Sequence, residues 1–297
     1  MNIRRALMLV VPLFCGLALT LAGCKPEVSK PARAGTGGAG GGTAAPTGGG
    51  ARPAAGALEV KAYNATIKGR VAFNGEGEPT IDAKATNLPP TECPAEVMAA
   101  GWYTKSSSDK KGVQYAVVYI RPVGGRLPKV PDDIAKPAVD TVEMHQPKCQ
   151  FEPRVVVMGP GQKLKFHNDS DPKISHDANL SGPMSYSKTL PPGESTVYDP
   201  EADNTQPYKV SCNQHSAFMS GFLWRFDHPF AAVTDGEGNF EIKKVPVLAS
   251  GKLSIMVWHE MLPGDSQNRM QIMEVELQDG EVKDLGTVGI PKPTKTS

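Results

Sequence analysis

The segment Cys212-Asn-Gln-His215-Ser-Ala-Phe-Met219 carries a thiol, an imidazole and a thioether within one short stretch of chain. Strand-like runs flank this segment, with Pro207-Tyr-Lys-Val-Ser211 before it and Gly221-Phe-Leu-Trp-Arg-Phe226 after it. Apolar and β-branched residues bounded by turn residues are typical of β-strands. The sequence therefore predicts a loop between two strands that presents three potential metal donors at one place.

A fourth donor lies upstream, at the end of His167-Asn-Asp-Ser-Asp-Pro-Lys-Ile-Ser-His176. A thiolate, two imidazoles and a thioether are the ligand set of a mononuclear electron-transfer copper site. We therefore expect one type 1 copper ion, held by His176, Cys212, His215 and Met219. His167 competes for the first position, but it directly follows a predicted strand and alternates outward, so His176 is favoured.

Each of these residues also has a plainer interpretation. Cys212 can be a buried structural thiol, His215 a surface loop histidine and Met219 a residue that fills a gap in the core. The remaining histidines are expected to be structural or surface residues; they are His145, His228 and His259.

Residues 1–23 have the pattern of a signal peptide, because Arg4 and Arg5 precede an apolar run over 6–22 that is too short to span a membrane comfortably. The run ends in Leu21-Ala22-Gly23-Cys24, which resembles the lipobox of bacterial lipoproteins. This resemblance implies cleavage before Cys24 and lipid on its sulfur, which predicts an envelope protein facing the periplasm or the outer membrane. An uncleaved N-terminal helix is the alternative.

The next segment, residues 24–57, consists largely of Gly, Ala, Pro and Thr. Such a composition buries too little apolar surface to fold, so we expect a flexible tether with a reach of roughly 30 Å. A folded body should follow over 58–290, with a tail at 291–297. The net charge is +1, and no basic stretch is interleaved with aromatic residues, so nucleic acid is not an expected partner.

Five cysteines are present in the chain. Cys15 falls in the signal peptide and Cys24 under lipid, which leaves Cys93, Cys149 and Cys212 for an oxidising compartment. Because a metal thiolate is protected from pairing, Cys212 is the expected odd one. A Cys93–Cys149 disulfide follows as a prediction, with two buried free thiols as the alternative.

Short strand-like runs recur after residue 58 with Gly and Pro between them, which predicts an all-β chain made of sandwiches. The predicted strands cover residues 66–73, 115–120, 154–158, 163–166, 208–210, 221–226, 240–242, 253–258 and 273–277.

Residues 139–226 resemble a Greek-key cupredoxin of the plastocyanin and azurin family. The landmarks occur in the family's order; they are Phe151-Glu-Pro153, Gly161-Gln-Lys-Leu-Lys-Phe166, Asn168, His176, Pro192-Gly193, Cys212, His215, Met219 and Gly221. The approach from Asn168 to His176 is longer than in plastocyanins. By analogy with the family, Asn168 or the backbone after His176 is expected to donate a hydrogen bond to the Cys212 sulfur.

The flanking segments are similar to carboxypeptidase-regulatory-like (transthyretin-like) sandwiches. Residues 231–242 and 257–260 look like the second half of that module, and residues 67–71 and 117–120 like the first half. We therefore expect a discontinuous sandwich of residues 58–125 and 227–290, with the cupredoxin inserted between them. Separate sequential domains are the alternative. The whole arrangement also resembles methylamine-utilisation-like envelope proteins, in which the ligand loop runs into a segment like His228-Pro-Phe-Ala-Ala-Val-Thr-Asp235.

These features predict a lipid-anchored blue copper protein that transfers single electrons to or from a redox partner in the envelope, with the edge of His215 exposed as the electron exit. An enzyme is not expected, because a copper oxidase or nitrite reductase needs extra histidines, and this chain has six and no His-x-His. Two alternatives are an envelope binding or adhesion module, and a copper-delivery protein without a redox role.

Overall fold

The computed structural model describes residues 56–75, 93, 107–171, 173–215, 219–262 and 269–292. These residues belong to one compact unit, residues 52–297. The predicted signal peptide 1–23, the lipidation site Cys24, residues 25–55 of the tether and residues 293–297 of the tail lie outside them. Among the described residues, no helix is long and apolar enough to cross a membrane.

The all-β prediction is confirmed, because the described residues form fifteen strands, one single-turn helix α1 (Asp132–Ala135) and one 3-10 turn (Pro147–Cys149). Each of the nine predicted runs overlaps an observed strand. Six further strands were not predicted: β3 (Thr141–His145), β6 (His176–Ser181), β7 (Tyr186–Leu190), β8 (Ser195–Tyr198), β11 (Ala231–Val233) and β15 (Val282–Ile290).

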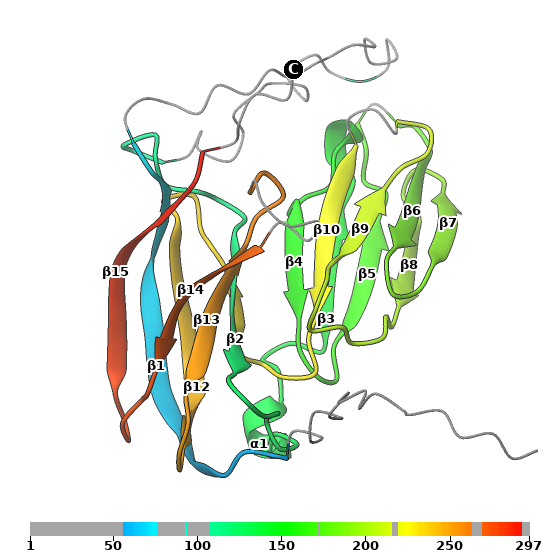
Figure 1. The fold of residues 1–297 in the computed structure, drawn as a ribbon. Helices are drawn as coiled ribbons and strands as arrows, with labels where there is room; N and C mark the ends of the chain where they lie inside the picture. The colour runs from blue at the N-terminus through cyan, green and yellow to red at the C-terminus, as the bar shows by residue number, and fades with distance from the viewer. Residues whose placement is uncertain are drawn as a thin grey trace, which may run out of the picture. The chain divides into compact units, whose positions relative to one another are not determined.

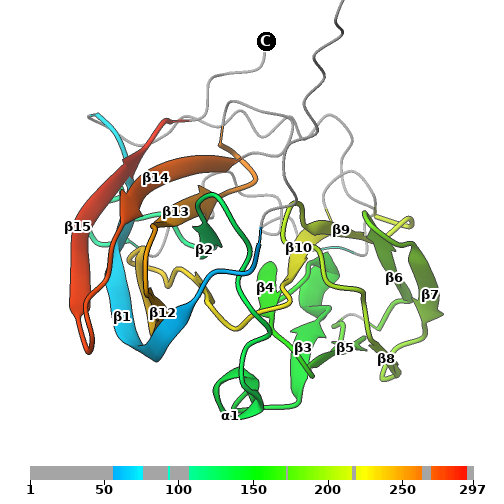
Figure 2. The same cartoon turned by 60° about the horizontal axis from the view of Figure 1, so that its bottom comes forward.

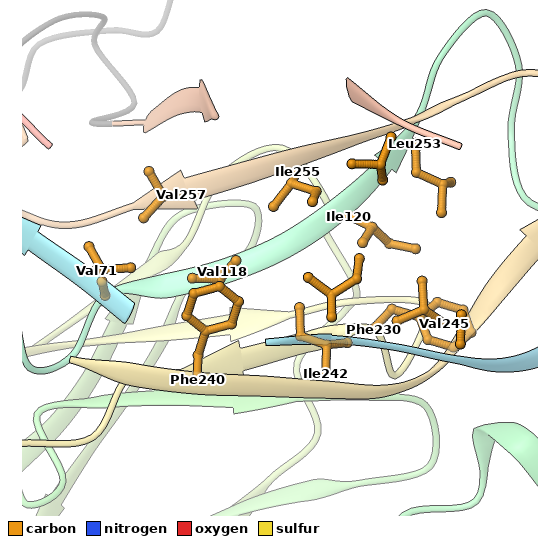
Figure 3. Close-up of a cluster of buried hydrophobic side chains, with 14 of the residues drawn as sticks. Val71, Val118, Ile120, Phe230, Phe240, Ile242, Val245, Leu253, Ile255 and Val257 are labelled. Atoms are coloured by element: carbon orange, nitrogen blue, oxygen red, sulfur yellow. The ribbon is translucent and has the colours of Figure 1, made fainter. Parts of the chain in front are cut away.

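The first sandwich consists of two sheets, which lie on the left of Figure 1. One has the order β12 (Asn239–Leu248), β1 (Val60–Phe73), β15; the other has the order β11, β2 (Val117–Pro122), β13 (Leu253–Trp258), β14 (Arg269–Val275). The side chains of facing strands meet in a hydrophobic core, which Figure 3 shows in close-up. Val71, Val118, Ile242, Ile255 and Val257 are among its buried members.

The second sandwich also has two sheets. The larger has the order β4 (Val155–Met158), β10 (Ser220–Arg225), β9 (Tyr208–Ser211), β6, β7; the smaller has the order β3, β5 (Lys163–His167), β8. Met144 and Phe166 from the smaller sheet and Tyr208 and Leu223 from the larger one are fully buried between them.

Strand β1 lies between two strands from the far end of the chain. It pairs antiparallel with β12 and parallel with β15, with Ile67 opposite both Ile242 and Lys283. Residues 66–73 therefore share a sheet with strands from 227–290, which is the pairing that the insertion hypothesis requires.

A separate aromatic cluster joins the two sandwiches. Tyr119 and Trp258 from β2 and β13 pack against Trp224 of β10 and the following Phe226, all of them at most 2% exposed. Figures 1 and 2 both show β4 and β10 on the side of the second sandwich nearest to β2. Aromatic pairs of this kind contribute both buried area and favourable ring geometry, so the sandwiches support each other.

The predicted disulfide between Cys93 and Cys149 is confirmed by an S–S bond. It ties a residue that precedes β2 to the 3-10 turn after β3.

Removing this disulfide is expected to destabilise the protein. The bridge closes a loop with a sequence separation of 56 residues. Such cross-links restrict the unfolded chain and typically raise the free energy of unfolding by roughly 2–4 kcal/mol. A Cys93→Ser/Cys149→Ser variant should unfold at lower guanidinium concentration than the oxidised parent, with the parent in reductant matching the variant. Equal unfolding midpoints for all three samples would contradict the prediction.

A second prediction concerns pH, because His228 and His259 are buried. Burial lowers the pKa of each imidazole to about 4, whereas the unfolded chain has ordinary values near 6.5. Between these values the unfolded state binds more protons, so the free energy of unfolding falls as pH drops from about 6.5 to about 4. The urea midpoint of the metal-free protein should be lower at pH 5 than at pH 7, and the difference should shrink in His228→Gln. A midpoint independent of pH over this range would contradict it.

Candidate metal centre

The segment from Cys212 to Met219, called the ligand loop below, connects β9 and β10, which pair as a hairpin. Ser211 and Ser220 are paired across the two strands, so the loop begins and ends at the same level of the sheet. Its backbone is hydrogen-bonded internally: the Met219 N–H donates to the His215 carbonyl at 2.9 Å, and the Cys212 N–H donates to the Met219 carbonyl at 3.2 Å. These bonds hold Cys212, His215 and Met219 within one short turn.

The remaining donor comes from the neighbouring strand. His176 is the first residue of β6, which pairs antiparallel with β9 through Asn179 opposite Ser211. Because the two strands run in opposite directions, His176 lies beyond the last residue of β9. It is therefore on the side where Cys212 begins the ligand loop.

Three donor atoms converge at this place. The Nδ1 atoms of His176 and His215 are 3.2 Å apart, and the Cys212 Sγ lies 3.9 Å from the first and 3.5 Å from the second. A triangle with these sides has a point about 2.1 Å from all three corners, close to the bond lengths of a transition metal with imidazole nitrogen and thiolate sulfur. The three separations thus suit one ion bound by all three atoms.

All four predicted ligands are buried. The exposed fraction is 0% for His176, Cys212 and Met219 and 3% for His215. Cys212 is a free thiol, and with Met219 it belongs to the core of the second sandwich. Water is therefore kept away from the donors by the same packing that stabilises the sandwich.

Burial also sets the protonation of the donors. Desolvation raises the pKa of the Cys212 thiol, and the backbone N–H of Asp177, 3.3 Å from the Sγ, partly offsets that effect. Desolvation, followed by the neighbouring His215, lowers the pKa of His176 to about 4. His176 is thus neutral at neutral pH and has a nitrogen lone pair that can bind a metal ion. The Cys212 thiolate, in contrast, is stable only if a positive charge lies nearby.

The hydrogen-bond donor to the Cys212 sulfur is therefore the backbone N–H of Asp177, the residue after His176. The other expected donor, Asn168, makes different hydrogen bonds. Its Nδ2 donates to the carbonyls of Ile174 and Leu190, at 2.9 and 2.7 Å. Asn168 thus fastens the long approach to His176 onto the adjacent strand.

The other histidines lie outside this group. His167, the competitor for the first ligand position, is stacked on His145 with ring centroids 4.7 Å apart. His228 and His259 are buried in contact with aromatic side chains, Phe226 and Phe230 for the first, Phe73 and Trp258 for the second.

One expectation was wrong. The edge of His215 is not exposed, and both disulfide sulfurs, from Cys93 and Cys149, lie within 4.8 Å of its ring nitrogen. The number of cysteines predicted the disulfide but not its position next to His215, because Cys93 is more than a hundred residues away from His215 in the sequence. The disulfide therefore covers part of the imidazole that was expected to face solvent.

No family model matches this chain, and no curated protein sequence does either. Solved structures similar to this chain include cupredoxins. A purple cupredoxin from Nitrosopumilus maritimus is 14% identical and has a TM-score of 0.24, over 28% of this chain and 97% of that one. A reduced auracyanin from Roseiflexus castenholzii is 16% identical and has a TM-score of 0.25, over 30% of this chain and 98% of that one.

A reduced mutant of amicyanin is 15% identical and has a TM-score of 0.25, over 36% of this chain and 98% of that one. Similarities this weak carry no argument about function, which has to come from the geometry of the site.

A prediction follows for Gly221, two residues after Met219. A Cβ on Gly221 would lie 2.7 Å from the Arg154 carbonyl oxygen and 3.3 Å from the Phe151 Cβ. Gly221→Ala should therefore push β10 away from β4 and lower the unfolding free energy by about 1–3 kcal/mol. Gly159→Ala is the matched control, because the nearest atom there is 3.5 Å away. Equal melting temperatures for the two variants would contradict this account.

Proposed function

We propose that this protein is a single-electron carrier of the bacterial cell envelope that holds one type 1 copper ion. Cys212, His176, His215 and Met219 would hold the ion. Copper bound by such a set supplies a reversible Cu(II)/Cu(I) couple. The properties of the bound ion would depend on the residues that hold and cover these four ligands.

The convergence of two imidazole nitrogens and one thiol sulfur carries the proposal. Their separations of 3.2, 3.5 and 3.9 Å suit one ion in a nearly trigonal arrangement. A soft sulfur together with two imidazoles selects copper or zinc over magnesium and calcium. Between copper and zinc, the buried Met219 in the same turn favours copper, because thioether ligands are soft.

The scaffold suits electron transfer because it limits movement of the ligands. Backbone hydrogen bonds fix the loop between β9 and β10, and sheet pairing fixes β6 beside β9. The Asp177 N–H donates to the Cys212 sulfur and thereby withdraws charge from the thiolate. Such contacts tune the potential of a metal site and orient its ligands.

The burial of the donors argues against delivery and against catalysis at this site. Transfer of an ion to another protein needs an incoming ligand, and catalysis needs a coordination position open to substrate. Here three donors are 0% exposed and His215 is 3% exposed. Electrons can cross such a covering, whereas ligands and substrates are blocked.

The envelope location and the partner are part of the proposal and rest on the sequence alone. Lipid on Cys24 would attach the chain to a membrane, and residues 25–55 would let the folded body reach a redox protein. Docking would be brief, as is usual for electron-transfer encounters.

The test is addition of Cu(II) to the metal-free protein, followed by visible and EPR spectroscopy. We expect an intense sulfur-to-copper charge-transfer band and a narrow copper hyperfine splitting, and both should be absent in Cys212→Ser. A wild-type protein that stays colourless, or that shows only tetragonal copper, would refute the proposal.

Met219→Leu is a companion variant that conserves volume. Because a thioether ligand would tune the reduction potential of the copper ion, and loss of a sulfur donor disfavours Cu(II), this variant should keep the charge-transfer band and have a higher potential by voltammetry. An unchanged potential would remove Met219 from the ligand set and leave the other three in place.

A further inference from the structure

A second group of donor side chains lies on the smaller sheet of the second sandwich. Strands β3 and β5 run parallel, and the register places His145 beside His167. Residues two apart along a strand share a face, so Glu143 lies on the same face as His145. Met144 and Phe166, which are also paired, point to the opposite face and are buried in the core.

Glu143 presents one carboxylate oxygen to each ring. Its Oε2 lies 3.7 Å from the His145 Nε2, and its Oε1 lies 3.4 Å from the His167 Nε2. The His167 Nε2 is buried and has no hydrogen-bond partner among the described residues. One donor atom from each of the three residues lies within 4.8 Å of the others. Three potential ligands thus face one small volume.

A second carboxylate fixes the orientation of one ring. The Asp169 Oδ2 is 2.9 Å from the His145 Nδ1, and its Oδ1 accepts the Gln146 backbone N–H at 3.0 Å. A proton on Nδ1 that is donated to Asp169 leaves the Nε2 lone pair directed toward Glu143. Metal-binding histidines are commonly held in this way by a carboxylate on the other nitrogen.

We propose that Glu143, His145 and His167 form a second metal site, which takes a divalent first-row cation such as Zn²⁺ or Cu²⁺. Two imidazoles and a carboxylate are a usual ligand set for these ions. Asp169 is a positioning residue that acts through His145. This proposal does not depend on the copper proposal, because the two sites share no residue and no strand.

Access suits an exchangeable ion. The side chains of Glu143, His145 and His167 are 50%, 39% and 23% exposed, so solvent reaches part of each side chain, although the His167 Nε2 atom itself is buried. The rings now stack with 7° between their planes, and they must turn for both lone pairs to meet at one ion. Binding should therefore perturb the ring resonances of both histidines together.

The competing explanation is a protonated His145 held between Asp169 and Glu143, with no metal. Zn²⁺ is the discriminating probe, since it cannot be reduced. Isothermal titration is best done in a Cys212→Ser background, because that variant lacks the thiolate of the buried site. We expect this background to bind one equivalent that disappears, or weakens at least about 100-fold, when His167→Gln is added.

Asp140→Asn is the matched control. It neutralises an exposed carboxylate immediately before β3 and should leave zinc affinity unchanged. Asp169→Asn should weaken binding about 10–100-fold, without changing the melting temperature in zinc-free buffer. A structural role alone would change the melting temperature and leave the affinity intact.

NMR of the wild-type protein gives an independent measurement that needs no substitution. Zn²⁺ should shift the imidazole signals of His145 and His167 at the same stoichiometry. The proposal is overturned if these signals do not move, if the Cys212→Ser background binds no zinc, or if His167→Gln binds as its parent does. Each of those results can occur with a normal blue copper spectrum, so the two proposals are tested separately.

Discussion

The burial of one thiol and two imidazoles in contact with each other is the constraint on which the structure depends. Polar groups removed from water cost free energy unless partners compensate them. Cys212 Sγ has the Asp177 N–H at 3.3 Å, while burial raises the pKa of the thiol and so disfavours the thiolate. A cation bound by the three facing donors, His176 Nδ1, His215 Nδ1 and Cys212 Sγ, would compensate the negative charge of the thiolate. The buried thiol is thus best stabilised as a thiolate when an ion is bound beside it.

Strand β10 connects this site to the rest of the molecule. Leu223 points into the core that holds the ligands, while its neighbour Trp224 points into the aromatic cluster shared with the first sandwich. Arg154 makes a second connection, because it donates to both carboxylate oxygens of Glu260 and to the carbonyl of Ser220, next to Met219. Packing between the sandwiches therefore also fixes one side of the ligand loop, and the first sandwich supports the site.

The sequence predicted the features that depend on local pattern or on chemistry. Strands with clear alternation, such as β1, or with an almost continuous apolar run, such as β13, were found. The four ligands were chosen because their donor atoms suit one ion. Strands β6, β7 and β8 were missed, since their polar residues give no apolar alternation. The cover over His215 and the pairing of His145 with His167 depend on register and on contacts between distant segments, which a single sequence does not encode locally. A parallel register that aligns two histidines is visible only once the strands are paired.

X-ray absorption at the copper edge of the loaded protein tests the central claim most directly. We predict two imidazole nitrogens and one short thiolate sulfur, from Cys212, at distances of about 2.1 Å, which the three donor atoms allow in their present positions. Replacing Cys212 by serine should remove this short sulfur contact. A shell of nitrogen and oxygen alone in the wild-type protein would contradict the account, because it would mean that the buried thiol and imidazoles do not share an ion.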